Sequence, residues 1–415
     1  MIDRTHDPER KSWVESANLP GADFPPQNLP WVTFHRREDL LLRPRPGVAI
    51  GDQLLDIEPF GVESIAVVMA ASRTARADLR RAIFDFLADP ANRPAAQLTP
   101  MAEAELLLPC AIGDYTDFYA SIDHATNVGR MFRPDNPLLP NYKWLPVGYH
   151  GRASSIVLSG TPVRRPCGQI AESAGGPPVY APSRRLDYEL ELGAFLGPGN
   201  RLGEPVPMAG AIDQIVGVCL LNDWSARDIQ TWEYQPLGPF LAKNFATSIS
   251  PFVVTAEALE PFRRPAEARP PGDPEPLPHL RGGPDAAYDI TLEVWLRSAK
   301  MAGPMRLSRG NFRGMYWTLA QMVAHHTSNG CNIRPGDLIA SGTVSGPEKS
   351  NRGCLLELTW RGTEPVELPT GETRRFLEDG DEVILRGWCE APGYRRIGLG
   401  ECRGRILPVG QTGSR

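Results

Sequence analysis

The segment LDYELELG, residues 186–193, carries two glutamates whose spacing raises the first question about chemistry in this chain. Side chains alternate along a strand, so Glu189 and Glu191 share one face with Asp187, while apolar side chains occupy the other face. Such alternation is typical of a strand whose polar face meets solvent. Two carboxylates on one face could instead be oxygen ligands of a cation. The segment alone leaves both interpretations open.

A second polar segment is DYTDFYASIDHATNVG, residues 114–129. Asp117 and Tyr119 are two residues apart and would share one face of a strand. His124 follows in a polar stretch, where it could act as a base or a ligand. The alternative is a surface turn that carries a solvated histidine.

A third segment is NDWSARDIQTWEYQPLG, residues 222–238. Asp223 ends the apolar run IVGVCLLND, which has the profile of a buried strand. Arg227, Gln230 and Tyr234 follow at helical spacing and would line one face of a short helix. The alternative is an ordinary polar helix face, although Asp223 would point at the same region.

Two further sets of residues have plausible structural interpretations. Lys243 and Thr247 lie among apolar and small residues in FLAKNFATS, where a lone lysine is usually a surface cation. His325 and His326 are neighbours on a predicted helix, point about 100° apart and cannot readily chelate one ion. The chain also lacks the dinucleotide-binding, P-loop, zinc-protease and nucleophile-elbow motifs.

Hydrophobic periodicity gives a coarse secondary structure. It predicts helices over 62–88, 95–108 and 315–330, and strands through the segments LLELTW, DEVILRGWC and RGRILPV. Ser225 and Asp228 have the spacing of a capping box and predict the start of a short helix. Residues 1–20 are polar and are expected to form a flexible extension.

The composition of the chain argues against several classes of protein. The chain has 415 residues, 41% of them hydrophobic, and a net charge of −5, which argues against a nucleic acid or a membrane as partner. The count of 42 prolines favours short strands and turns over a helical bundle. Seven cysteines without a C-x-x-C pair argue against a disulfide framework. With no apolar signal core at the start, a cytoplasmic location is expected.

Several long segments together resemble the fumarylacetoacetate hydrolase family. They are, in chain order, DYTDFYASIDHATNVG, LPVGYHGRASSIVLSGTPVRRPCGQ, LDYELELGAFLGPGN, NDWSARDIQTWEYQPLGPFLAKNF and CNIRPGDLIASGTVSG. The resemblance implies a mainly β (α+β) fold, assembled as a homodimer. A small N-terminal SH3-like domain would span residues 21–110, and a larger catalytic domain with a mixed β-roll would span residues 111–415.

The same resemblance implies the metal ligands. They are Asp117, Glu189, Glu191 and Asp223, with calcium (Ca²⁺) at these carboxylates and magnesium (Mg²⁺) near Lys243 and Thr247. Four converging carboxylates would repel one another without a cation, and ligands that are all oxygen favour these hard ions over zinc. A lysine ammonium, however, has no lone pair to offer Mg²⁺.

The implied reaction is hydrolysis of the carbon–carbon bond of a β-diketo acid, 4-fumarylacetoacetate, to fumarate and acetoacetate. This is the last step of tyrosine and phenylalanine catabolism through homogentisate. His124 would act as the general base, oriented by Glu357. The resemblance assigns the stabilisation of developing negative charge to Arg227, Gln230 and Lys243. It assigns substrate binding to Tyr119, Arg133, Tyr149, Gln230, Tyr234 and Thr343.

Two alternatives remain open from sequence. The same superfamily includes metal-dependent acylpyruvate hydrolases, hydratases and decarboxylases that act on smaller keto acids. The chain could also be a catalytically silent cation-binding protein. The joint presence of His124, Glu357 and Lys243 favours an enzyme, because metal storage would not require these residues.

Overall fold

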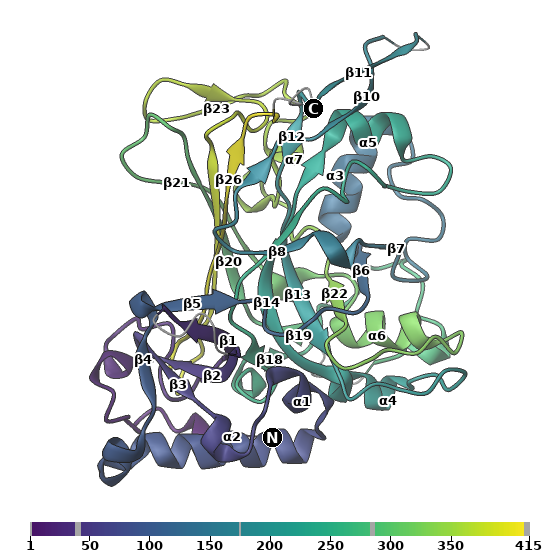
Figure 1. Ribbon diagram of the computed structural model, residues 1–415. Helices are drawn as coiled ribbons and strands as arrows, with labels where there is room; N and C mark the ends of the chain where they lie inside the picture. Colours follow the sequence, from purple (N-terminus) through teal and green to yellow (C-terminus); the bar gives the residue numbers. More distant parts are fainter. Residues whose placement is uncertain (1, 38–42, 174–175, 283–286, 411–415) are drawn as a thin grey trace.

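The N-terminal part of the chain folds as an antiparallel sheet beside two helices (Figure 1). The computed structural model describes residues 2–37, 43–173, 176–282 and 287–410, so the predicted domains extend over a few residues outside this description. The strand order is β4-β3-β2-β1-β5. The bounds are Trp31–Arg36 (β1), Arg45–Ile50 (β2), Gln53–Asp56 (β3), Leu98–Pro100 (β4), Ala104–Leu107 (β5), Ile65–Ala70 (α1) and Arg73–Ala88 (α2).

Residues 2–20 are not the flexible extension that their polarity predicts. They form two short 3-10 turns, Arg4–His6 and Glu15–Asn18, that lie against the N-terminal part. Thr5 and Ser12 are buried, and the Ser12 hydroxyl donates a hydrogen bond to the Leu87 carbonyl at 2.9 Å. The prediction was wrong because these polar side chains bond to the fold rather than to water.

Replacing Ser12 by alanine is therefore expected to lower the free energy of unfolding by about 1 kcal/mol, because its hydroxyl also accepts from the Val14 N–H. Urea titration followed by circular dichroism measures this change. Lys11→Ala is the matched control, since the Lys11 side chain is exposed. Equal stability of the two variants would contradict the packing of this segment.

The larger C-terminal part contains a central mixed sheet. Its strand order is β7-β6-β22-β13-β14-β16-β8, with β17 paired to β14 beside this path. Strands β6 and β22 run parallel, as do β8 and β16, and the other pairs are antiparallel. The bounds are Tyr115–Phe118 (β6), Gly148–His150 (β7), Ile156–Leu158 (β8), Leu190–Leu196 (β13), Ile215–Asp223 (β14), Thr247–Ile249 (β16), Val254–Thr255 (β17) and Leu338–Ala340 (β22).

A second sheet and four short strand pairs are the other β structure among the residues that the structure describes. The second sheet has the order β21-β20-β25-β26-β9, with bounds Val163–Arg164 (β9), Thr291–Arg297 (β20), Met305–Asn311 (β21), Glu382–Cys389 (β25) and Ile397–Leu407 (β26). The pairs are Cys167–Ala171 (β10) with Pro178–Pro182 (β11), Leu186–Asp187 (β12) with Ser225–Ala226 (β15), Arg263–Arg264 (β18) with Ala287–Tyr288 (β19), and Val366–Glu367 (β23) with Thr373–Arg374 (β24). The prediction of a mainly β fold is confirmed.

Strands β13 and β14 are buried along their whole length because apolar clusters cover both faces of the central sheet. On one face Leu192 belongs to the same cluster as Leu292 of the second sheet. On the other face Leu221 belongs to the same cluster as Ile50 of the N-terminal sheet. A core shared in this way joins the N-terminal and C-terminal parts, and any acidic side chain at these strands is kept from bulk water.

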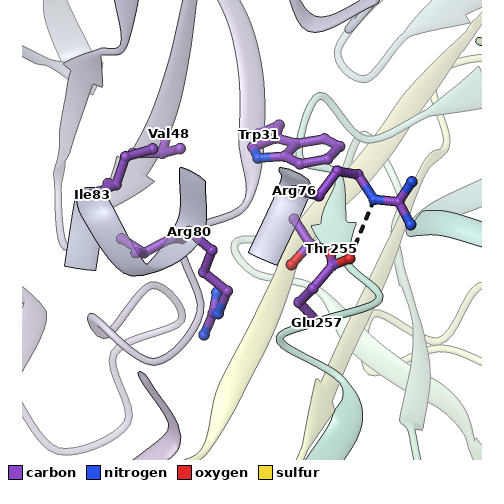
Figure 2. A pocket seen from close by; sticks show the side chains of 8 residues that line it. Trp31, Val48, Arg76, Arg80, Ile83, Thr255 and Glu257 are labelled. Atoms are coloured by element: carbon purple, nitrogen blue, oxygen red, sulfur yellow. Dashed lines mark hydrogen bonds and ion pairs between the residues drawn. The ribbon is translucent and has the colours of Figure 1, made fainter. Parts of the chain in front are cut away.

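A buried ion pair also joins the two parts. Figure 2 shows Arg76 of α2 reaching Glu257 of the C-terminal part, with Trp31 close by. The Arg76 Nε lies 3.2 Å from a Glu257 carboxylate oxygen, and neither side chain is exposed by more than 8%. A cavity of about 10 Å³ lies beside this pair, lined by Trp31 and Arg76 of the N-terminal part and by Glu257 of the C-terminal part.

Five α-helices in the described residues of the C-terminal part lie beside the sheets. Their bounds are Ile122–Phe132 (α3), Met208–Ala211 (α4), Arg227–Glu233 (α5), Leu319–Thr327 (α6) and Leu355–Leu358 (α7). Helix α6 confirms the centre of the segment predicted at 315–330. The capping box at Ser225 is wrong, because Ser225 lies in β15 and α5 begins after Ala226 without a side-chain cap. No helix in the described ranges is both long and apolar enough to span a membrane.

Candidate active site

Three neighbouring regions of the central sheet bring buried carboxylates together. Asp117 comes from β6, Glu191 from β13, and Asp223 from the last position of β14. One carboxylate oxygen from each residue lies within 4.8 Å of the others, and none of the side chains is more than 2% exposed. The acidic face of the segment 186–193 is therefore buried rather than solvated.

The oxygen ligands of this carboxylate cluster (Asp117, Glu191 and Asp223) suit a cation. Within the described chain, Asp117 Oδ1 and Glu191 Oε1 are buried without a hydrogen-bond donor. Burial and the nearby Asp223 raise the pKa of Asp117 well above its ordinary value, and burial and Asp117 do the same for the pKa of Glu191. A hard divalent ion would supply the missing positive partner, because its preferred ligands are carboxylate oxygens.

Glu189, the fourth predicted ligand, is paired with two basic side chains. Lys243 Nζ contacts one of its oxygens, and Arg227 Nη2 lies 2.7 Å from the other. Although burial opposes it, these two cations lower the pKa of Glu189 below the ordinary range. Lys243 Nζ also donates to Asp223 at 2.7 Å, and therefore connects Glu189 to the carboxylate cluster.

Lys243 serves as a counter-ion in this geometry. Although burial acts in the opposite direction, Asp223 and Glu189 raise the pKa of Lys243, which keeps it protonated and without a lone pair. Thr247 lies opposite Asp223 in the pairing of β14 with β16, and its hydroxyl is 3.4 Å from Asp223 Oδ1. A Mg²⁺ site at Lys243 and Thr247 stays a prediction, and the protonated lysine does not favour it.

His124 and Glu357 form a buried pair beside the carboxylates. His124 Nδ1 lies 2.6 Å from Glu357 Oε2, and Glu357 also accepts hydrogen bonds from Asn127 at 2.9 Å and Ser345 at 2.8 Å. Despite its burial, the contact with His124 and these donors lower the pKa of Glu357 to about 2. An ionised Glu357 can only accept, so His124 Nδ1 carries a proton, and in the neutral imidazole the lone pair is on Nε2.

Local structure restricts the position of His124 in this pair with Glu357. Ser121 caps α3 by accepting from the His124 N–H at 3.2 Å, which fixes the first turn that carries His124. The Nε2 atom then lies 4.0 Å from Glu189 Oε1. The lone pair of His124 therefore lies beside the cluster of carboxylates and basic groups.

Several predicted substrate contacts lie at the same place. The Tyr149 hydroxyl is 3.0 Å from an Asp117 oxygen and 2.9 Å from an Asp223 oxygen. The Tyr119 ring packs edge-on against the His124 ring, with centroids 5.1 Å apart. Gln230 Oε1 accepts from Arg227 Nη1 at 3.2 Å.

The structure does not bring every predicted substrate residue into this cluster. Arg133 is exposed just after α3 and donates to the Pro137 carbonyl at 3.1 Å. Tyr234 is 39% exposed at the end of α5. Thr343 is buried, and no hydrogen bond of its side chain is among the described contacts. Their roles in substrate binding stay predictions.

Sequence reasoning missed three residues of this site: Asn127, Ser345 and Asp187. Asn127 follows His124 by three residues on α3, so helical spacing could have identified it as a neighbour on the same face. Ser345 lies in a loop, and no local pattern singles it out. Asp187 was assigned only to the acidic strand face, although its carboxylate binds Arg227 Nε at 2.9 Å.

Comparisons with known proteins show what this chain is similar to. Residues 114–407 match the family described as Fumarylacetoacetate (FAA) hydrolase C-terminal. The chain is 50% identical to a fumarylacetoacetase of Bos taurus and 49% identical to one of Homo sapiens, covering in both cases 94% of this chain and 97% of the relative. A fumarylacetoacetase of Oryza sativa is 46% identical over 96% of this chain and 97% of that protein.

Solved structures share the fold. A fumarylacetoacetate hydrolase of Exiguobacterium antarcticum aligns with a TM-score of 0.54 at 18% identity, over 92% of this chain and 99% of that one. A maleylpyruvate hydrolase of Sphingobium, solved with manganese and pyruvate, aligns with a TM-score of 0.51 at 16% identity, over 92% of this chain and 100% of that one. At these identities, the likeness concerns the fold alone.

Proposed function

The chain belongs to the fumarylacetoacetate hydrolase family, so it is a hydrolase, and we propose that it cleaves 4-fumarylacetoacetate with water. The products would be fumarate and acetoacetate. The observation that supports this most is the His124–Glu357 pair, with its 2.6 Å contact, next to buried carboxylates and two basic side chains. A silent cation-binding protein would need only the carboxylates.

His124 begins the proposed reaction. Its Nε2 takes a proton from water, and the hydroxide oxygen forms a bond to the carbonyl carbon next to the fumaroyl double bond. Glu357 accepts the Nδ1 proton in a hydrogen bond and stabilises the imidazolium that results. The positively charged Arg227 and Lys243 stabilise the negative charge that develops on the attacked carbonyl oxygen.

The carbon–carbon bond then breaks. Its electron pair leaves with the acetoacetate portion as an enolate, while the attacked carbon becomes the new carboxyl group of fumarate. The proton held by His124 neutralises the enolate, so one water molecule is consumed and the base is restored.

The residues that would hold a divalent cation are Asp117, Glu191 and Asp223, with Glu189 beside them. When bound, such an ion would supply Lewis-acid polarisation of the attacked carbonyl. Calcium and magnesium both suit these ligands, because both are hard cations that prefer oxygen.

Cation binding is expected to release protons from the carboxylate cluster at pH values above the ordinary carboxyl range. Burial raises the pKa of Asp117 and Glu191, so the cation-free centre keeps a proton that the ion must displace. The affinity for the cation should therefore rise with pH. The cation-free protein should lose stability as the pH rises above the ordinary carboxyl range. Calorimetry in two buffers of different ionisation enthalpy measures the release. Binding without proton release and without pH dependence would contradict the shifted pKa values.

Arg133 is proposed to bind a terminal carboxylate of the substrate. Arg133→Lys keeps the charge but loses the planar fork, so KM should rise roughly tenfold with a smaller change in kcat. Steady-state kinetics measures both values. The control is Arg130→Lys, because Arg130 is exposed nearby on α3 and has no proposed contact with substrate. An unchanged KM for Arg133→Lys would assign Arg133 to another role.

We also propose a homodimer in the cytoplasm, with no nucleic acid or membrane partner. Several apolar side chains of one stretch are exposed, which supports an interaction surface: Trp232, Leu237, Phe240 and Leu241. Sedimentation tests the assembly.

A panel of diketo acids, with and without added Ca²⁺ or Mg²⁺, shows whether the protein prefers 4-fumarylacetoacetate to the smaller acylpyruvates that related enzymes take. No loss of ultraviolet absorbance with any substrate would favour a silent cation-binding protein.

A further inference from the structure

We propose that Asp187 is a positioning residue that holds Glu357 against His124 and Arg227 against Glu189. This rests on the proposed role of His124 as the general base. The buried Asp187 carboxylate is 0% exposed and lies at the end of β12, two residues before Glu189. It connects two elements that are far apart in the sequence, α7 and α5.

One set of contacts runs to α7. Asp187 Oδ1 accepts from the Leu355 N–H at 2.8 Å, and Oδ2 accepts from the Leu356 N–H at 3.0 Å. Helix α7 has only four residues. The side chain of its N-cap residue Cys354 does not cap the helix backbone, and its thiol lies 3.2 Å from Glu357 Oε2 instead. Because such a short helix has little stability of its own, the hydrogen bonds to Asp187 hold its first turn and hence the backbone of Glu357, whose carboxylate is also bound by Asn127 and Ser345.

The other contact runs to α5. Asp187 Oδ2 also accepts from Arg227 Nε at 2.9 Å, and the Nη2 atom of the same guanidinium lies 2.7 Å from Glu189 Oε1. The Asp187 carboxylate thus sets the position of the His124–Glu357 pair. It also sets the position of Arg227, which is proposed to stabilise the developing negative charge.

An amide cannot replace this carboxylate. Oδ1 accepts from Leu355 and from the Tyr188 N–H, and Oδ2 accepts from Leu356 and Arg227. An asparagine has one oxygen, so in either orientation its NH₂ group faces two donors, one of them an N–H of α7. In Asp187→Asn one of the first two N–H groups of α7 must lose its partner, and the Glu357 carboxylate should shift from His124.

The expected result for Asp187→Asn is a roughly 10–100-fold lower kcat, as for other groups that orient catalytic ligands. KM should stay within about threefold of the wild-type value, and the bound cation per subunit should be unchanged. The proton on His124 Nδ1, which resonates far downfield in the NMR spectrum and is identified by its loss in His124→Asn, should shift upfield or broaden. In a Glu357→Gln background the same change should cost less than in the wild-type protein, because the part of the effect that Asp187 exerts through Glu357 is already lost while the part exerted through Arg227 remains.

The matched control is Asp381→Asn. Asp381 is also a buried carboxylate that binds a guanidinium, that of Arg374, and a backbone N–H, that of Glu378. Both variants should lose stability, but only Asp187→Asn should change kcat and the His124 resonance. If Asp187→Asn loses stability like the control and keeps both kcat and the resonance, the proposal is wrong.

The remaining outcomes are also decisive. If the resonance shifts while kcat does not change, Asp187 positions His124 without consequence for turnover, and the proposal fails as well. If His124→Asn itself stays active, the proposed general base is wrong, while the resonance in Asp187→Asn still reports the positioning. Should the asparagine variant not fold, Asp187→Ser carries the same expectations, because one hydroxyl cannot accept from all four donors.

Discussion

Replacing His124 by asparagine is expected to lower kcat by about 10² to 10⁴, the usual contribution of a general base. The amide of asparagine can still donate to Glu357 Oε2, which lies 2.6 Å from the imidazole Nδ1 in this structure. What the variant lacks is the lone pair of Nε2 that would take a proton from water. Fold and bound cation should persist, because His124 is not among the carboxylate ligands.

Single-turnover rates and bound cation per subunit, measured on the same sample, test this expectation. The matched control is His326→Asn, since His326 bonds only to the Thr116 hydroxyl at 2.9 Å among the contacts described for its side chain. That variant should keep its kcat. Near-normal turnover by His124→Asn would contradict the proposed mechanism. Glu357→Gln should also lower kcat, and its effect should not be additive with that of His124→Asn.

The second large effect is expected at the carboxylate cluster. Asp223→Asn keeps the size of the side chain but removes a charge that lies within 4.8 Å of Asp117 and Glu191. A cation present at about 100 times its Kd stabilises the native state by roughly 2.7 kcal/mol. The variant should lose most of this stabilisation and nearly all of its activity.

Thermal melting with added cation and with chelator measures the effect. The wild-type Tm should fall when the cation is removed, whereas the Tm of Asp223→Asn should hardly respond. Asp56→Asn is the control, because Asp56 is buried in the N-terminal sheet and bonds to Arg45 there. Its Tm should be lower but should still respond to the cation. A wild-type Tm that does not change with chelator would argue against a tight site.

Local sequence patterns predicted the parts of the site that lie on regular strands. Alternation along residues 186–193 placed Glu189 and Glu191 on one face, and the apolar run before Asp223 predicted a buried strand. Alternation could not tell a buried acidic face from a solvated one. That depends on the second sheet and the N-terminal part, which cover β13 and β14 on both sides.

The pairing of His124 with Glu357 could not be derived from spacing, because 233 residues separate them. The segment LLELTW was predicted as a strand, yet residues 355–358 form the helix α7. The distant Asp187 binds the first two N–H groups of that helix, and such a tertiary contact overrides local propensity. Only the family resemblance indicated the role of Glu357.

The segment 95–108 shows the same limit in the N-terminal part. Its hydrophobic periodicity predicted a helix, whereas the structure has β4, a short 3-10 turn and β5. Both strands lie at the edges of the N-terminal sheet, where pairing with β3 and β1 satisfies their backbone groups. Pairing with distant strands outweighed the intrinsic preference of these residues for a helix.

Hydrolysis of 4-fumarylacetoacetate in water enriched in ¹⁸O tests the central claim most directly. Water attack on the carbonyl beside the double bond predicts equal amounts of fumarate and acetoacetate, with one ¹⁸O in the new carboxyl group of fumarate. The His124→Asn protein, with its cation still bound, should form no labelled fumarate in the time of many wild-type turnovers. Unlabelled fumarate from the wild-type protein, or labelled fumarate formed by His124→Asn at the wild-type rate, would contradict the account.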